Sequence, residues 1–319
     1  ACDKFVDLNG VDDAQAARMI RDDGIDILVD LAGYTDMSRP GIFARRPAPL
    51  QISWLGYVAT MGAPWIDYLV ADPIALPPEH EPFYSEAPLR MPAGQYLCSY
   101  ANAVLDVPPT RGDVGLPDTG RVLGAMHNAY KIDPEIFALW MRILISNDDA
   151  VLWLLDCGTT ANANLRAHAR SHGVDEMRLI FAARIPHAQH LARMQLVDLV
   201  LDTPQCNGSS TIADAMVVGV PTIACLGEIF AQRMAASLLS AAGQDHLIAR
   251  DLKQYESLAN EFLRDPLRLV DERARIKAAR QHALFYRPQD WVQYLENGLL
   301  RAWRDCCDGR SPRAIEVRA

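Results

Sequence analysis

The sequence predicts an α/β protein built from two Rossmann-like halves. Short apolar runs alternate with amphipathic stretches along most of the 319 residues, a pattern typical of parallel sheets covered by helices. A proline-rich stretch at 73–120 interrupts this alternation. Half of the residues are hydrophobic, so the chain can bury two cores. We therefore expect two lobes that face each other across a cleft and are joined by an extended connector.

The first lobe is expected to span residues 1–72. Its predicted strands are apolar runs bounded by glycine or polar residues, and they lie at 4–8, 25–31, 50–54 and 68–72. Helices are predicted at 12–23 and 39–46. The loop at 55–64 follows a strand and therefore lies at the sheet edge where open α/β sheets bind ligands. In the connector at 73–120, proline removes backbone donors and fixes φ, so no long element is expected there.

The second lobe is expected to span residues 121–287. Strands are predicted at 121–126, 151–155, 178–182, 199–201 and 222–225. Helices are predicted at 133–146, 161–172, 188–196, 209–219, 230–242, 254–264 and 266–283. Asp133 followed by Pro134 is a typical helix start. The last segment, 288–319, is predicted to be a C-terminal helix and a tail.

The stretch from Leu199 to Ala224 contains the first candidate site. An apolar run is followed by turn-forming residues, and Ser209, Ser210 and Thr211 stand where the next helix opens. Free backbone N–H groups, hydroxyls and the positive end of the helix dipole would together bind an anion such as a diphosphate. An ordinary helix with a polar cap has the same pattern, and spacing alone does not decide between the two.

Other polar residues also follow predicted strands of the second lobe. Lys131 comes just after 121–126, where an ammonium group would meet phosphate, and His187 and His190 come after 178–182. Asp214 lies in the first turns of the helix that starts near Ser209, where it would bond ribose hydroxyls or merely complement the dipole. Taken singly, each has a structural explanation. Because parallel strands share one carboxyl edge, we expect these groups to converge on a nucleotide site.

Composition narrows the function classes. The net charge of −9 argues against a nucleic-acid surface, and no apolar run approaches the roughly 20 residues that span a bilayer. The seven cysteines lack zinc-like spacing and are predicted to be reduced, mostly buried thiols of a cytoplasmic protein. No convincing Asp-x-Asp metal motif and no Ser-His-Asp or thiol nucleophile pattern competes with the nucleotide site.

Seven longer motifs occur in order over most of the chain. They are Arg45-Arg-Pro-Ala-Pro-Leu-Gln51, Trp54-Leu-Gly-Tyr57, Tyr84-Ser-Glu86, Tyr130-Lys-Ile-Asp-Pro134, Val151-Leu-Trp-Leu-Leu155, Asp202-Thr-Pro-x-Cys-Asn-Gly208 and Arg233-Met-Ala-Ala-Ser237. Together they resemble the catalytic region of the O-linked N-acetylglucosamine transferase (SPINDLY-like) family. The resemblance implies a GT-B type fold and an inverting glycosyltransferase that needs no metal. It would move N-acetylglucosamine from UDP-GlcNAc to Ser or Thr of proteins.

The resemblance also implies roles for single residues. Lys131 matches the lysine that binds the donor diphosphate and stabilises the leaving group, and Asn128 lies where the family usually has glutamine. Ile185, Pro186 and His187 match the segment that lies against the uracil, and His190 matches a nearby histidine that contacts the donor. The phosphate-binding triplet is matched by Ser209, Ser210 and Thr211, and the ribose-binding aspartate by Asp214.

Some features depart from the family pattern. Ser209 stands where the triplet usually begins with histidine, and Val58-Ala-Thr60 replaces a more usual Pro-Gly-Thr. Family members carry upstream the first strands of the N-terminal lobe, a histidine proposed as general base and usually tetratricopeptide repeats. We expect these to lie outside this chain, so that its first lobe is incomplete and the chain alone binds UDP but transfers sugar poorly.

Two alternatives stay open at the level of sequence. One is a related transferase that uses another nucleotide sugar, such as UDP-glucose or GDP-fucose, or an Asn acceptor. The other is a nucleotide-binding fragment without catalysis. The loop at 185–190 should discriminate between donors, since in the family it faces the base.

Overall fold

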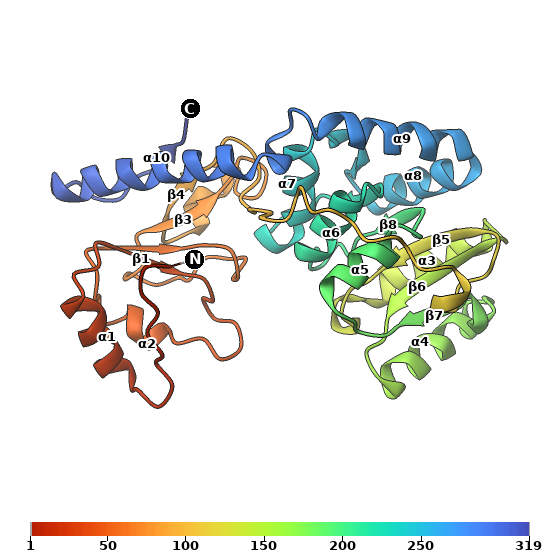
Figure 1. Cartoon of the computed structure of the whole chain (residues 1–319), viewed down its shortest axis with the longest axis horizontal. Coiled ribbons are helices and arrows are strands. Elements are labelled where there is room, and N and C mark those ends of the chain that lie inside the picture. The colour runs from red at the N-terminus through yellow and green to blue at the C-terminus, as the bar shows by residue number, and fades with distance from the viewer. Residues whose placement is uncertain (1, 319) are drawn as a thin grey trace. The chain divides into compact units, whose positions relative to one another are not determined.

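The computed structural model describes residues 2–318, which form two compact units (Figure 1). One unit holds the residues up to Gln95 together with those from Gln289 onward, and the other spans Tyr96–Pro288. Each contains one parallel sheet. These limits differ from the expected 1–72, 73–120, 121–287 and 288–319, because residues before Gln95 and the C-terminal segment add strands to the first sheet.

The sheet of the first unit has the order β1-β2-β3-β4-β11. Its strands are β1 (Ile27–Asp30), β2 (Leu50–Ser53), β3 (Tyr68–Ala71), β4 (Ala87–Arg90) and β11 (Ile315–Glu316). The helices are α1 (Asp13–Asp22), α2 (Pro40–Phe43), α10 (Pro288–Cys307) and the 3-10 helix Pro78–Phe83. Ile52, Leu69 and Leu89 are fully buried, as expected for strands covered on both faces.

Strand β4 lies inside the segment where proline density predicted no long element. Pro88 is paired with Leu69 of β3, whereas β11 pairs only with Leu89 and Arg90. Pro88 therefore lies outside the β4–β11 ladder, which its missing N–H would have weakened. Proline in this stretch does not prevent a strand, and β4 is as long as β1, β2 and β3.

Helix α10 is part of the core of the first unit. A Cβ at Gly298 would lie 2.8 Å from Leu89 Cδ2 and 2.9 Å from Val317 Cγ2, so any other residue would have to displace these side chains of the sheet. Trp291 stacks on Trp54 with ring centroids 5.3 Å apart. The C-terminal helix thus belongs to the same core as the strands near the N-terminus.

Two predictions for the first unit need correction. The strand predicted at 4–8 does not form: Phe5 is 83% exposed, and β1 pairs with β2 alone among residues 2–318. An apolar run without a neighbouring strand has nowhere to place its backbone donors. The helix predicted at 39–46 is shortened to α2, because Arg46 turns to a left-handed φ of 45° just before Pro47.

The sheet of the second unit has the order β10-β9-β8-β5-β6-β7. Its strands are β5 (Arg121–Ala125), β6 (Ala150–Leu155), β7 (Leu179–Ala182), β8 (Leu199–Leu201), β9 (Thr222–Cys225) and β10 (Ile248–Ala249). Counted from β5, this is the 3-2-1-4-5-6 order of a Rossmann fold. The chain reverses its direction across the sheet between β5 and β8, so the ligand site is expected at their carboxyl ends.

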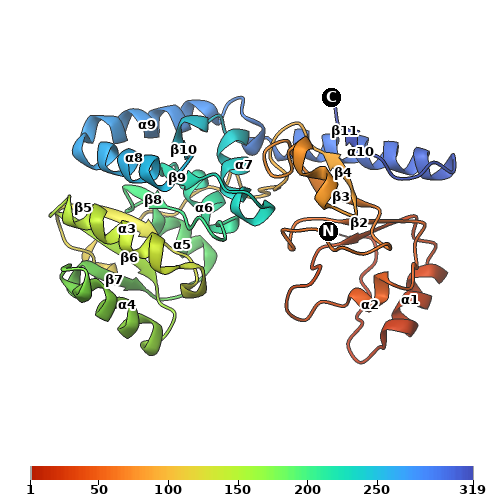
Figure 2. The same cartoon turned by 180° about the vertical axis from the view of Figure 1, so that it is seen from behind.

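Helices cover this second sheet (Figure 2). They are α3 (Pro134–Ile145), α4 (Thr159–Ser171), α5 (His187–Met194), α6 (Ser210–Val218), α7 (Met234–Ala241), α8 (Leu252–Arg264) and α9 (Pro266–Ala279). Short 3-10 helices lie at Gly112–Val114, Ala129–Lys131, Glu176–Arg178, Phe230–Gln232, Asp245–Leu247 and Leu284–Tyr286. Asp133 caps α3 as predicted, accepting hydrogen bonds from the N–H groups of Glu135 and Ile136.

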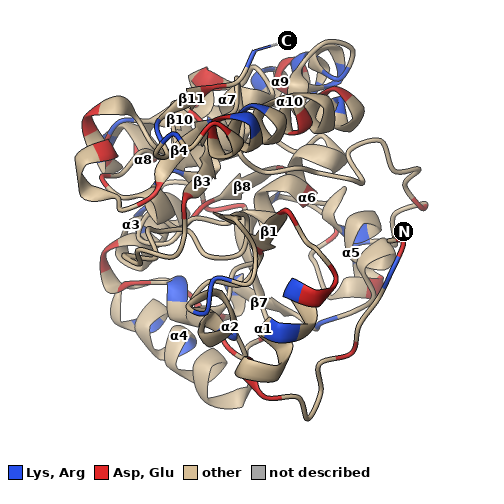
Figure 3. Ribbon diagram, turned by 90° about the vertical axis from the view of Figure 1, so that its left-hand side faces the viewer, with Lys and Arg blue, Asp and Glu red and all other residues tan. Residues whose placement is uncertain are grey.

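The structure also shows where charged residues and cysteines lie. Acidic and basic residues are interspersed along α1 (Figure 3). The cysteines are free, but of these only Cys98 and Cys225 are buried, fewer than predicted. Within residues 2–318, no helix combines the length and apolar character needed to cross a membrane.

Candidate functional site

All of the predicted site residues lie in the second unit, in the segments that follow β5, β7 and β8. The loop after β5 contains Asn128 and Lys131, the loop after β7 leads into α5, and the loop after β8 leads into α6. These three strands belong to one parallel sheet. The segments that carry the predicted site residues therefore start from the same edge of the sheet, as expected.

Lys131 reaches the loop that precedes α6. It is the last residue of a 3-10 helix, and its Nζ donates to the carbonyl oxygen of Asn207 at 2.9 Å. Asn207 is itself fixed, because its Nδ2 donates to the Thr203 carbonyl at 3.0 Å and its Oδ1 accepts from the N–H of Ala235 at 3.2 Å. A rigid loop thus holds the ammonium two residues before the helix cap Ser209.

The N-terminus of α6 keeps its polar groups available. Ser209 is the N-cap, but its side chain accepts no hydrogen bond from the helix. Ser210 is exposed and Thr211 is half-buried. The first-turn N–H groups therefore lack the usual side-chain partner, and the helix dipole adds positive potential. Together with Lys131, this arrangement favours an anion.

Asp214 is the centre of a second cluster, one turn further along α6. Its side chain is 8% exposed, and its Oδ1 accepts from the Tyr100 hydroxyl at 2.8 Å. His187 Nε2 lies 2.9 Å from the same oxygen, and His190 Nε2 lies 3.7 Å from Oδ2. The structure thus brings together three residues that the sequence predicted, Asp214, His187 and His190, and adds Tyr100.

His190 has a defined hydrogen-bond role. Burial, opposed by Asp214, lowers the pKa of its imidazole. Arg193 Nε donates to His190 Nδ1 at 3.2 Å, so Nδ1 is the acceptor and the ring hydrogen lies on Nε2, toward Asp214. Arg193 is buried and also donates to the Ala183 carbonyl at 2.7 Å. The neutral imidazole is therefore held in one tautomer.

A buried acid and a buried histidine lie at the point where the sheet changes direction. His127 follows β5 and Asp202 follows β8, and His127 Nε2 lies 3.5 Å from Asp202 Oδ1. Burial, opposed by the Gly208 N–H and the Lys131 charge, raises the pKa of Asp202 to about 7, and burial together with the Lys131 charge lowers the pKa of His127 to about 3. Asp202 Oδ1 also accepts from the N–H of Gly208 at 2.8 Å, which ties the pair to the loop of Asn207.

Gly208 is required by this close packing. A Cβ at this position would lie 2.9 Å from Cε1 of the buried His127. The glycine lets the loop approach the imidazole while its N–H reaches Asp202. The glycine that ends the motif from Asp202 to Gly208 is thus explained by its packing against His127.

The remaining predicted residues lie at the exposed rim. Asn128 Oδ1 accepts from Arg184 at 2.5 Å. Ile185 is 37% exposed, Pro186 is the N-cap of α5, and His187 is its first residue. The N–H of His190 donates to the Pro186 carbonyl oxygen at 2.9 Å, so the first turn of α5 ties this segment to the Asp214 cluster. Ile185 and Pro186 stand on the same loop as His187.

Sequence reasoning missed Tyr100, Arg184, His127 and Asp202 as members of this region. Arg184 stands beside the predicted segment at 185–190, so its cationic charge after a strand was a usable signal. Asp202 ends an apolar run, but its complete burial is a tertiary feature. Tyr100 lies 114 positions from Asp214 in the chain, and no local pattern links them.

A metal site is not apparent at this edge. Among residues 2–318, no group of three or more His, Cys, Asp or Glu side chains is arranged to hold a metal ion. The positive groups here are Lys131, Arg184 and the start of α6. The described residues could therefore offset the charge of a diphosphate by cations and N–H groups of the chain.

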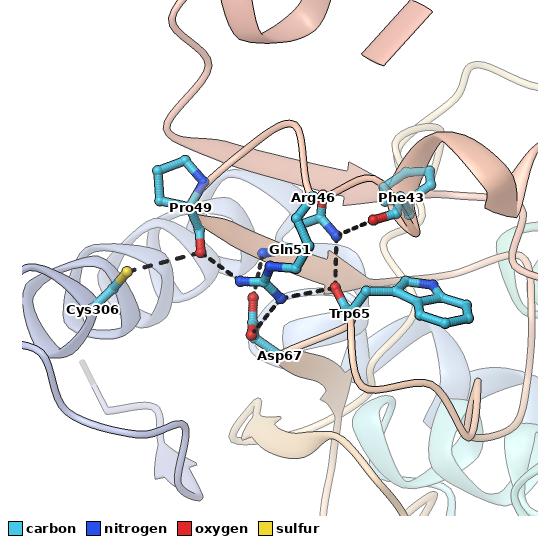
Figure 4. A network of polar contacts seen from close by, with 7 residues as sticks. All are labelled: Phe43, Arg46, Pro49, Gln51, Trp65, Asp67 and Cys306. Carbon is cyan, nitrogen blue, oxygen red and sulfur yellow. Dashed lines mark hydrogen bonds and ion pairs between the residues drawn. The ribbon is translucent and has the colours of Figure 1, made fainter. Parts of the chain in front are cut away.

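Another motif of the resemblance proves to be structural (Figure 4). Arg46 donates to the Trp65 carbonyl at 3.1 Å and to Asp67 at 3.0 Å, and Gln51 Nε2 donates to the carbonyls of Phe43 and Trp65 at 2.9 and 2.6 Å. The Gln51 N–H donates to Asp67 Oδ2 at 2.8 Å. This network joins β2 to the segment that enters β3. The motif from Arg45 to Gln51 therefore stabilises the first unit.

Comparison with known families gives one clear match. The model of glycosyl transferase family 41 matches residues 1–108 and 100–295 of this chain. These ranges cover both sheets except for the strand β11. The match agrees with the resemblance derived from the motifs.

Individual relatives support the same assignment. The chain is 34% identical to a probable UDP-N-acetylglucosamine–peptide N-acetylglucosaminyltransferase, SEC of Arabidopsis thaliana, over 98% of this chain and 33% of that relative. It is 28% identical to the SPINDLY protein of Oryza sativa subsp. japonica, which carries the same probable activity in its name, over 96% of this chain and 33% of the relative. The chain thus spans about one third of the length of these curated relatives.

A solved structure extends the likeness to three dimensions. A mutant of the Thermobaculum terrenum O-GlcNAc transferase superposes with a TM-score of 0.89 at 30% identity, covering 96% of this chain and 58% of that one. Together with the two parallel sheets, this confirms the predicted α/β fold with two Rossmann-like units. The predicted resemblance to the O-GlcNAc transferase (SPINDLY-like) family is confirmed as well.

Proposed function

Because the chain belongs to glycosyl transferase family 41, we propose that it binds UDP-GlcNAc and moves N-acetylglucosamine to Ser or Thr hydroxyls of proteins, with inversion at the anomeric carbon. The observation that carries this proposal is the hydrogen bond from Lys131 to Asn207, which brings a cation to the loop opening α6. A diphosphate bound there would meet an ammonium group, hydroxyls and helix N–H groups together.

In the proposed reaction, an acceptor hydroxyl attacks the anomeric carbon as the bond to the UDP oxygen breaks. Negative charge then grows on the leaving diphosphate. Lys131 opposes this charge, and Ser209, Ser210 and Thr211 with the N–H groups of α6 bind the phosphate oxygens. Such preorganised donors act mainly in the transition state, where the charge is largest.

The nucleoside part of the donor is proposed to follow the rim of the site. Asp214 accepts a ribose hydroxyl, and His190, held as the Nε2–H tautomer, supports the donor beside it. The segment Ile185, Pro186 and His187 lies along the uracil, and Asn128 lies near the phosphates. Lys131, Arg184 and α6 supply the positive potential, so the proposal needs no metal ion.

Isothermal titration tests this proposal directly. The 319-residue chain is titrated with UDP in excess chelator and again in excess magnesium, and we expect the same dissociation constant in both. GDP serves as the competing ligand, because the alternative of a GDP-sugar donor predicts that GDP binds at least as well as UDP. A strict magnesium requirement, or a preference for GDP, would contradict the proposed donor and its metal-free binding.

A further inference from the structure

We propose that Tyr100 is a positioning residue of the nucleotide site, whose hydroxyl orients the Asp214 carboxylate so that Oδ2 accepts a ribose hydroxyl. This inference rests on the proposed function, because it takes Asp214 as the group that meets the ribose. It adds a residue from a segment that no motif marks and that lies outside the strands and helices of the sheet.

The two oxygens of Asp214 are used unequally. Oδ1 accepts from the Tyr100 hydroxyl at 2.8 Å, and His187 Nε2 lies 2.9 Å from it. A carboxylate oxygen offers about two lone-pair sites, so these two donors fill Oδ1. The polar neighbour of Oδ2 among the described residues is His190 Nε2, at 3.7 Å, beyond an ordinary N–H···O bond. Oδ2 is therefore the oxygen with capacity for a ligand hydroxyl.

Tyr100 is a dependable donor. Burial, and then the negative charge of Asp214, raises the pKa of its phenol well above the ordinary value. The hydroxyl therefore keeps its hydrogen at neutral pH. A hydroxyl that donates to a carboxylate makes a charge-assisted bond, which is stronger than a neutral one.

The segment around Tyr100 is anchored on both sides. Cys98 is 1% exposed, and Asn102 Nδ2 donates to the Tyr286 carbonyl at 3.0 Å. The Tyr100 ring meets the His187 ring edge-on, with centroids 4.8 Å apart. By contrast, the His187 side chain is 52% exposed. Of the two donors to Oδ1, Tyr100 is thus the more buried one, and it lies in the anchored segment.

The test measures how well the 319-residue chain discriminates ribose hydroxyls. Isothermal titration gives the dissociation constants of UDP, 2′-deoxy-UDP and 3′-deoxy-UDP. We expect the unchanged chain to prefer UDP over at least one of the deoxy ligands. Tyr100→Phe should reduce this preference by about 5- to 10-fold, because a misoriented carboxylate loses part of a charged hydrogen bond. Affinity for the deoxy ligand should change less than about twofold, since that ligand does not use the bond.

Tyr96→Phe is the matched control. It removes a phenolic hydroxyl from the same segment, and that hydroxyl lies 3.4 Å from Ser210 Oγ, at the limit of a hydrogen bond. It should leave the ratio of UDP to deoxy-UDP affinity unchanged. In an Asp214→Asn background, Tyr100→Phe should no longer alter this ratio. Melting temperatures of all variants show whether each is folded.

The outcomes separate this inference from the function on which it rests. If the unchanged chain prefers UDP and Tyr100→Phe keeps that preference, the positioning role is wrong and the proposed function stands. An equal loss for all three ligands would likewise make Tyr100 a packing residue. Absence of UDP binding by the unchanged chain would overturn the proposed function and this inference with it.

Discussion

Each unit contains a polar network, and the two networks differ in how closely their titratable groups are paired. In the first unit, Arg46, Gln51 and Asp67 bond to backbone groups and to one another across β2 and the entry to β3 (Figure 4). In the second unit, His127 and Asp202 are almost completely buried but approach each other only to 3.5 Å. Asp202 Oδ2 and both imidazole nitrogens have no hydrogen-bond partner among the described residues, whereas the unpaired atoms of the first network are the neutral Gln51 Oε1 and Trp65 Nε1.

The difference separates a network that joins neighbouring backbone segments from one that lies beside the proposed site. Backbone-directed bonds in the first unit hold adjacent segments together, including the left-handed Arg46 at φ 45°. The poorly paired groups of the second unit lie where the sheet changes direction, and their pKa values are strongly shifted. Native proteins keep few unpaired buried groups, and those they keep concentrate at functional sites. Membership in a family motif does not distinguish the two.

The largest expected effect comes from Lys131. In any protein that contains this chain and transfers N-acetylglucosamine, Lys131→Ala should lower the transfer rate by about 10² to 10³, as loss of one preorganised electrostatic donor typically does. Melting temperature should change little, because the half-buried side chain makes one bond, to Asn207. Steady-state transfer and thermal melting are measured together.

Lys253→Ala is the control for this prediction, since Lys253 is an exposed lysine of α8 in the same unit. It should change neither the transfer rate nor the melting temperature. A sharp fall in the melting temperature of Lys131→Ala, with unchanged activity per folded molecule, would make Lys131 a structural residue.

The second prediction addresses the network of the first unit. Asp67→Ala should lower the free energy of unfolding by about 2 kcal/mol, because the Gln51 N–H and the Arg46 guanidinium lose their shared acceptor. UDP affinity should stay unchanged, because the proposed site lies in the second unit. Urea unfolding and titration with UDP check both parts. Arg18→Ala, at an exposed position of α1, should stay within about 0.5 kcal/mol of the unchanged chain.

Much of the second unit could be predicted from the sequence because its signals are local. The run from Val151 to Leu155 is a continuous apolar strand, and Asp133 with Pro134 marks the start of a helix. Such patterns depend on neighbouring residues alone. The convergence of Lys131 with the loop before α6 followed from the rule that parallel strands share one carboxyl edge.

The features that were missed depend on distant parts of the chain. Strands β10 and β11 are two residues long, and β11 exists through its pairing with β4, whose residues lie over two hundred positions earlier. The strand predicted at 4–8 had the right composition but no partner. Tyr100 reaches Asp214 over 114 positions. Periodicity and spacing carry no information about such contacts.

The third prediction concerns pH. In the unfolded chain between about pH 4 and 6.5, Asp202 is ionised and His127 is protonated, so the pair binds one proton. In the folded chain, the raised pKa of Asp202 and the lowered pKa of His127 also leave the pair with one proton. Equal proton numbers mean that the pair gives no pH dependence of stability over this range.

Removing either partner should reveal opposite slopes. Asp202→Asn leaves His127 alone, so the unfolded chain binds more protons and stability falls as pH drops below about 6.5. His127→Gln leaves Asp202 alone, so the folded chain binds more protons and stability falls as pH rises from about 4 to about 7. Each slope approaches 1.4 kcal/mol per pH unit, the value for about one proton. Urea unfolding at several pH values measures it, and parallel slopes in the two variants would contradict the pairing.

The smallest effect should come from Ser209, the cap of α6. Replacing an N-cap serine by alanine usually costs about 1 kcal/mol, because a helix N–H loses its side-chain acceptor. The Ser209 side chain makes no such bond, whereas Asp133 accepts from two N–H groups of α3. Asp133→Ala should therefore lower the free energy of unfolding by about 1 kcal/mol, and Ser209→Ala by only a few tenths. If the Ser209 hydroxyl binds phosphate, Ser209→Ala should instead weaken UDP binding by about 3- to 10-fold. This is the range expected when one hydrogen bond to a charged group is lost and a water molecule partly replaces the hydroxyl. A loss of stability in Ser209→Ala equal to that in Asp133→Ala, with unchanged UDP affinity, would make this residue an ordinary cap.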